Sequence, residues 1–125
     1  MIQFFNNEDT VGSASIYEAH ITFNKSMLKY FEFAYRVRIG IDKEESKVYI
    51  FMINKDYALS GEIPQSSLLP VSTSKTYARV CSRAMVEYIC SCFNLSIEKK
   101  SFLKFDAIYD EKLKAIVLNM KGEKK

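Results

Sequence analysis

The sequence predicts an α+β fold in which two pseudo-symmetric strand–helix–strand–strand halves form one mostly antiparallel sheet or small barrel. The first observation is a repeat: residues 23–31 (FNKSMLKYF) recur as residues 81–89 (CSRAMVEYI), with Met and Tyr identical and other positions replaced in kind. The second is a charged turn after each copy, DKE at residues 42–44 and DEK at residues 110–112. A unit of ~35–45 residues is too small to bury its apolar face alone, so two units should cover each other.

The repeat also has an alternative explanation, because any two amphipathic helices need a cap and apolar residues at similar spacing. We take the 125 residues as a single domain, 1–125, with halves at about 16–53 and 76–120, a connector at 54–75 and a flexible tail at 121–125. The helix match, from residue 23 to residue 81, has an offset of 58 residues, and the turn match, from residue 42 to residue 110, has an offset of 68. The second half therefore contains about ten extra residues, around 90–100. A hydrophobic content of 48% with 26% charged residues is typical of a globular chain.

In the first half, residues 6–15 are polar and indicate a loop, and residues 16–23 alternate loosely, as in a strand. Asn24 is placed to cap a short helix. The apolar stripe of that helix consists of Met27, Leu28 and Phe31. Residues 35–42 alternate between apolar and polar or charged side chains and predict a half-buried strand. Residues 47–53 are apolar on both faces, which is typical of a central strand covered on both sides.

The second half repeats this order. Residues 76–81 form the predicted lead strand, and Ser82 caps a longer helix. The apolar stripe of that helix consists of Met85, Val86, Ile89, Cys92 and Phe93. Asn94 can end the helix in a left-handed turn, and residues 102–109 and 114–120 are the predicted hairpin strands.

No group of residues points to catalysis, so we expect a protein that is not an enzyme and holds no cofactor or metal. His20 is the single histidine, and no acid, base and nucleophile set can be assembled around it. Cys81, Cys90 and Cys92 are odd in number and lack the spacing of a zinc site, and we interpret Cys81 and Cys92 as packing residues. The odd number of cysteines fits a reduced protein, and the sequence has no basic leader, so we expect a cytoplasmic chain. We expect no membrane span, because no apolar run is longer than residues 48–53.

Positive charge is concentrated in the second half of the chain. Residues 1–60 carry 7 Lys/Arg and 8 Asp/Glu, whereas residues 61–125 carry 11 and 7, which accounts for the formal charge of +3. The candidate nucleic-acid-binding residues are Lys25, Arg36, Arg38, Lys75, Arg79, Arg83 and Lys104. Such side chains could meet phosphate groups, helped by helix N-termini. The alternative is an ordinary solvated face, with Arg38 paired to a carboxylate and Asp106 interrupting the basic stripe.

Four segments of the first half carry a resemblance to a known family. They are residues 21–25 (ITFNK), 27–31 (MLKYF), 37–39 (VRI) and 48–50 (VYI). Together they resemble the AbrB/SpoVT swapped-hairpin family of small bacterial and archaeal DNA-binding domains, which usually dimerise to complete a small barrel. The layout is also similar to that of small bacterial proteins with two such units in tandem. Asn24 stands where the family has proline, and residues 13–20 lack the basic residues that the family places before its first strand.

These observations predict a non-enzymatic binding module, either an AbrB-like DNA-binding regulator or a mobile-element accessory protein. Its partner would be duplex DNA, and it would act as a pseudo-dimeric monomer or a weak homodimer. The alternative is a protein–protein interaction domain with no nucleic-acid role, which would use an exposed strand edge or the apolar residues 47–53.

Overall fold

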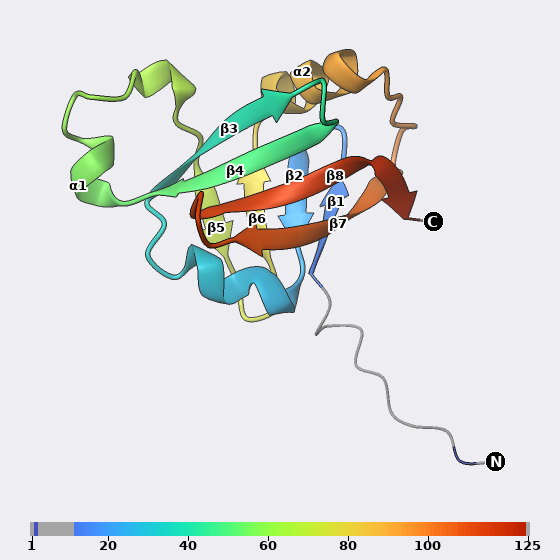
Figure 1. The fold of residues 1–125 in the computed structure, drawn as a ribbon, viewed down its shortest axis with the longest axis horizontal. Helices are drawn as coiled ribbons and strands as arrows, with labels where there is room; N and C mark the ends of the chain where they lie inside the picture. The colour runs from blue at the N-terminus through green and yellow to red at the C-terminus, as the bar shows by residue number, and fades with distance from the viewer. Residues whose placement is uncertain (1, 3–11, 125) are drawn as a thin grey trace.

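Eight β-strands form one antiparallel sheet in the computed structural model, which describes residue 2 and residues 12–124 (Figure 1). The strands are β1 (Ser13–Ile16), β2 (His20–Phe23), β3 (Arg36–Asp42), β4 (Lys47–Ile53), β5 (Val71–Thr73), β6 (Ala78–Cys81), β7 (Leu103–Asp110) and β8 (Ala115–Lys124). Their order across the sheet is β3-β4-β8-β7-β1-β2-β6-β5.

The two ends of this order approach each other, so the sheet is nearly closed and barrel-like. Leu69, just before β5, accepts a hydrogen bond of 3.0 Å from the backbone N–H of Val37 in β3 and donates one of 2.8 Å to the Val37 carbonyl. Figure 1 shows β3, β4, β8 and β7 as one layer with β1, β2, β5 and β6 behind it. Near-closure pairs backbone groups that an open sheet would leave exposed at its edges.

The space between the layers is filled by alternate side chains of the strands, because successive residues of a strand point to opposite faces. The largest fully buried side chains are Phe23, Phe105, Ile16, Ile21, Ile50, Ile89, Ile116 and Leu118. A second, smaller cluster lies outside this core, where Ile53, Ala58 and Ile63 pack together beside the helical turn α1 (Lys55–Ala58). The outer face of β4 is therefore covered at one end only.

Two helical segments lie at opposite ends of the barrel-like sheet, the 3₁₀ helix η2 (Lys25–Phe31) and the helix α2 (Arg83–Phe93) (Figure 1). Each buries one stripe against the core, which is why both are amphipathic. The predicted cap of α2 is confirmed, since Ser82 Oγ accepts from the Met85 N–H at 3.1 Å. The predicted left-handed end is also confirmed, with Asn94 at a φ of 55°.

The prediction of two strand–helix–strand–strand halves is wrong. Strands from both parts of the sequence interleave in one sheet, with β4 paired to β8 and β2 paired to β6. The main core is likewise shared, because Phe23 and Phe105 belong to one buried cluster. A separate half would leave unpaired N–H and C=O groups along its strand edges, and pairing across the halves satisfies them.

The predicted single strand at residues 16–23 is wrong as well. It is the hairpin of β1 and β2, in which the Tyr17 N–H donates to the His20 carbonyl at 2.8 Å. Most of β1 comes from the predicted loop 6–15, of which residues 6–11 lie outside the described part of the chain. The loop prediction failed because the small side chains of residues 13–16 (SASI) resemble loop composition. Small side chains nevertheless fit β1, which is paired with β2 on one side and β7 on the other.

The connector and the tail also contain more regular structure than the composition predicts. Residues 54–75 hold α1, the 3₁₀ turn η3 (Gln65–Ser67) and β5. The tail, predicted to be flexible over 121–125, continues β8 as far as Lys124, with Lys125 outside the described residues. The connector pairs with β6 through β5 and with β3 through Leu69, and the tail pairs with the start of β7; composition does not reveal these pairings.

The repeated segments, 23–31 and 81–89, take different conformations. Met27 and Met85 are both buried, but Phe23 is buried whereas Cys81 is exposed. The inward residues are the second and fourth of β2 and the first and third of β6, so the two strands differ by one residue in register. The packing role predicted for Cys81 is therefore wrong.

Asn24 has a different role from the predicted cap. It precedes η2 in an extended conformation, but its side chain makes no capping hydrogen bond to the helix backbone. Its Oδ1 accepts from the Ser13 N–H at 3.0 Å and from Ser26 Oγ at 3.1 Å. The amide thus ties the start of η2 to β1.

Candidate functional site

A row of polar side chains crosses five strands on the outer face of the sheet. Direct cross-strand pairs connect its members in the order Ser72 (β5), Arg79 (β6), Thr22 (β2), Ser15 (β1) and Lys104 (β7). The row contains two cations and three hydroxyl groups. We call these five residues the polar row.

The pleat of the strands explains why these side chains face outward. Arg79 stands between Ala78 and Val80, both fully buried, and the neighbours of Thr22 in β2 are fully buried as well. Because inward positions are taken by apolar residues, the alternating positions must project from the sheet. In-register pairing then brings them into one line.

Two atoms at the centre of the polar row lack hydrogen-bond partners. Thr22 Oγ1 and Arg79 Nε are both shielded from solvent, and neither makes a hydrogen bond within the described residues. The Arg79 guanidinium carbon lies 5.2 Å from the Tyr77 ring centroid, which fixes the side chain over an aromatic face. Shielded polar atoms without partners are uncommon in folded proteins, and they cost stability.

Three aromatic rings form a line beside the polar row. The rings of Tyr17 and His20 are stacked with centroids 4.5 Å apart, and Phe102 lies 5.1 Å from Tyr17 on the other side. Phe102 is 46% exposed. Burial, and secondarily the positive charge of Arg79, lowers the pKa of His20 below its usual value, so the imidazole is neutral at pH 7. We call Tyr17, His20 and Phe102 the aromatic line.

The structure brings only part of the predicted basic set to this row. Arg79 and Lys104 belong to it, Lys75 lies in the turn just before β6, and Lys25 is exposed at the start of η2. Arg83, at the start of α2, forms a long ion pair of 3.8 Å with Glu18 and remains exposed. An exposed pair at this distance contributes little to stability.

The two remaining predicted residues, Arg36 and Arg38, lie on β3 and are separated from the row. Arg36 donates to the Tyr35 carbonyl at 2.9 Å, and its guanidinium stacks 4.3 Å from the Tyr35 ring centroid. Arg38 is exposed and lines a different hollow together with Phe51 and Tyr57. The seven cations therefore do not form one continuous patch.

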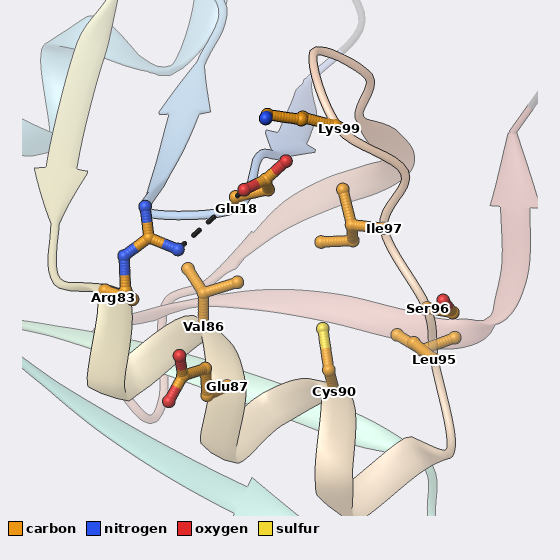
Figure 2. A pocket seen from close by; sticks show the side chains of 9 residues that line it. All are labelled: Glu18, Arg83, Val86, Glu87, Cys90, Leu95, Ser96, Ile97 and Lys99. Carbon is orange, nitrogen blue, oxygen red and sulfur yellow. Dashed lines mark ion pairs between the residues drawn. The ribbon is translucent and has the colours of Figure 1, made fainter.

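A shallow pocket of about 460 Å³ lies near the aromatic line, between α2, the β1–β2 turn and the segment after α2 (Figure 2). Its floor is apolar and its rim carries both signs of charge. The floor consists of Val86, Cys90, Leu95 and Ile97, and the rim of Glu18, Arg83, Glu87 and Lys99. Burial raises the pKa of the Cys90 thiol, which keeps it protonated and weakly nucleophilic. The pocket is thus suited to packing rather than to covalent chemistry.

Within residues 12–124, no three His, Cys, Asp or Glu side chains are arranged to hold a metal ion. None of the helices in this range has the length and apolar character needed to cross a membrane. Comparison of the chain with protein-family models, curated proteins and solved structures gives no match. The residues themselves are therefore the basis for any functional assignment.

The hydroxyl residues of the polar row and Phe102 were missed by the sequence reasoning. Ser15 was assigned to a loop and Ser72 to the connector, so neither was placed in a strand. The signal that could have found them is the alternation of polar and apolar residues around Thr22 and Arg79. Alternation identifies the outward residues of each strand, but the strand pairing must be known before those residues can be aligned across the sheet.

Proposed function

We propose that this protein binds nucleic acid through the polar row and the aromatic line. The observation that carries the proposal is the alignment of Arg79 and Lys104 with three hydroxyl groups on one sheet face. Phosphate oxygens accept hydrogen bonds from guanidinium, ammonium and hydroxyl groups, so the row presents suitable donors. Within Arg79 the donors for a phosphate are the terminal guanidinium N–H groups, because Nε is shielded from solvent.

The spacing along the row favours contact with several phosphates of one strand. Arg79 and Lys104 are separated by three strand-to-strand steps, which corresponds to roughly 14 Å in a flat sheet. A single phosphate cannot reach both cations, whereas a strand that runs across the sheet can. With two cations in the row, the electrostatic part of the affinity should be modest and sensitive to salt.

The aromatic line favours single-stranded over duplex nucleic acid. Bases in a duplex are stacked on one another, so their faces are not available to side chains such as Phe102. In a single strand the bases can stack on aromatic rings beside a basic track, and each such contact contributes about 1–3 kcal/mol. The proposed partner therefore differs from the duplex DNA expected from the sequence.

Fluorescence anisotropy with a labelled 12-nucleotide thymidine strand, compared with a 12-bp duplex, tests the proposal. We expect the single strand to bind more tightly at ~50 mM salt, where phosphate contacts are strong. The double substitution Arg79→Ala with Lys104→Ala should flatten the salt dependence by a slope of about 1.4, since each phosphate contact on a single strand contributes about 0.7. Lys55→Ala, in α1, removes one positive charge outside the polar row and should leave the salt slope unchanged.

Phe102→Ala separates stacking from charge. It should weaken binding of the single strand while the salt slope stays unchanged, because no phosphate contact is removed. Absence of binding to both nucleic acids at ~50 mM salt, or equal effects of the Arg79 and Lys55 substitutions, would overturn the proposal.

A further inference from the structure

A second surface begins on β7, beyond the polar row, and extends to β3; its apolar side chains are exposed or half-buried except for Ala115, which is fully buried. It is the outer face of β3, β4, β8 and β7, where cross-strand pairs align two rows. One row is Gly40, Tyr49, Val117 and Ile108; the other is Arg38, Phe51, Ala115 and Asp110. We call these eight residues the outer hairpin face.

Ile108 is the most exposed apolar residue of this face, with 68% of its surface accessible. Beside it, Val117, Tyr49 and Phe51 are only half-buried, and the two rings lie 6.3 Å apart along β4. The prediction that residues 47–53 are covered on both sides is therefore met on the inner face and, on the outer face, only at the Ile53 end. An apolar strip of this kind across several strands is typical of a surface that contacts another protein.

Gly40 interrupts β3 without a conformational reason within the chain. Its backbone does not adopt the left-handed region that requires glycine, and a Cβ there would be 3.4 Å from Phe51 Cε2 and 3.8 Å from Tyr49 Cβ, which are ordinary contacts. Glycine in a strand interior is unfavourable unless another group approaches closely. Here it lowers the floor of an open hollow of about 390 Å³, whose far side is formed by Tyr57 and Ile63.

We propose that the outer hairpin face docks against the same face of a second copy of this chain. A two-fold axis that runs parallel to the strands, between β4 and β8, exchanges β3 with β7 and β4 with β8. The residue at one end of a row in one copy then faces the residue at the other end of the same row in the second copy. Ile108 of each copy lies over Gly40 of the other, so the most exposed apolar side chain of the face meets the glycine that lines the hollow.

The same operation pairs opposite charges. Arg38 and Asp110 occupy the two ends of one row, so Arg38 of each copy faces Asp110 of the other. Neither residue forms an ion pair within the described part of its own chain. A surface that is complementary to itself under a two-fold rotation is the requirement for an isologous dimer, and both the charges and the apolar contacts of this face meet it.

The size of the face indicates a weak dimer. Four strands about 4.8 Å apart, with two rows of side chains about 6.8 Å apart along each strand, cover roughly 260 Å² per copy. Stable interfaces bury about 800 Å² per partner. The dimer should therefore dissociate on dilution, in the micromolar range. Arg79 and Lys104 lie outside this interface, so the dimer and the nucleic-acid proposal can fail independently.

Sedimentation velocity over ~1–500 μM protein, the range in which an interface of this size should dissociate, tests the dimer. The wild type should shift from monomer to dimer as its concentration rises. Gly40→Val should keep the fold, because its Cβ is accommodated within the chain, yet raise the dissociation constant at least tenfold by blocking Ile108. Ile108→Lys should act similarly, whereas Phe33→Lys, at a residue that is 84% exposed elsewhere, should not.

Charge reversal tests the two-fold geometry itself. Arg38→Glu alone brings two carboxylates together at both ends of the row, and Asp110→Lys alone brings two cations together there, so each variant should be monomeric. A mixture of the two variants forms a heterodimer in which opposite charges face each other again, and association should recover. Asp110 also accepts from the Lys112 N–H at 2.9 Å, so circular dichroism must show that its variant is folded. A wild type that is monomeric throughout, or a Gly40→Val variant that dimerises normally, overturns the proposal.

Discussion

Thr22 and Arg79 stand directly opposite each other on β2 and β6, and each holds a solvent-shielded polar atom without a hydrogen-bond partner in the described chain. Two such atoms side by side cost stability, because their hydration is lost and nothing in the chain replaces it. Because both atoms are closed to solvent, a ligand can supply the missing partners only if the two side chains move. Thr22 and Arg79 therefore affect the stability of the fold, and both belong to the polar row that we propose to bind nucleic acid.

Thr22→Val should stabilise the protein by about 1 kcal/mol. Valine keeps the shape and the strand preference of threonine while removing a hydroxyl that has no partner. Urea denaturation measures the change, and Thr73→Val, at an exposed hydroxyl of β5, serves as the control with an effect within about 0.5 kcal/mol. If the polar row binds phosphate, the Thr22 variant should also bind the oligonucleotide more weakly. A destabilised Thr22 variant would show that the hydroxyl has a partner in solution.

Acidification below pH ~6.5 should weaken the fold through His20. Its folded pKa lies below the unfolded value of about 6.5, so the unfolded chain binds more protons in this window. The free energy of unfolding therefore falls as the pH drops from 6.5 toward the folded pKa of His20. NMR titration of the single imidazole should give a pKa below 6.5, and His20→Gln should lose this part of the pH dependence. A titration midpoint above 6.5 would contradict the burial of the ring.

Ser82→Ala should destabilise the protein by about 1 kcal/mol, because Ser82 Oγ accepts the free N–H of Met85 at the start of α2. Ser91→Ala is a matched control in the same helix, at an exposed position where alanine is the better helix former. It should be neutral or slightly stabilising. Thermal unfolding of both variants checks the difference, and equal effects would mean that the cap contributes nothing.

Iodoacetamide at pH 8 should modify Cys81 before Cys90. Cys81 is exposed at the end of β6, whereas Cys90 is half-buried in the pocket of Figure 2 and its pKa is raised by burial. Only the thiolate reacts, so both accessibility and protonation protect Cys90. Peptide mass spectrometry over time measures the order, and the difference between these two thiols should shrink in concentrated urea. Faster reaction of Cys90 would show that the pocket opens in solution.

Local patterns in the sequence predicted the local elements well. The alternation at residues 35–42 and the apolar run at 47–53 correspond to β3 and β4, and Ser82 and Asn94 bound α2 as expected. Each of these signals depends on neighbours within a few residues. The site was predicted less completely: Arg79 and Lys104 were among the candidates, but Arg38 belongs to another face. Charge alone does not tell which cations share a surface.

The sequence by itself determined the hairpins β3–β4 and β7–β8 and the two ends of α2, at Ser82 and Asn94. Only the tertiary structure decided that β2 pairs with β6 and β4 with β8, because pairing between distant strands depends on satisfying backbone groups along whole edges. That pairing, and no local motif, placed Ser72, Arg79, Thr22, Ser15 and Lys104 in one line. It also left Ile108 exposed in register with Gly40, since a shift of one residue would turn the opposite face of each strand outward.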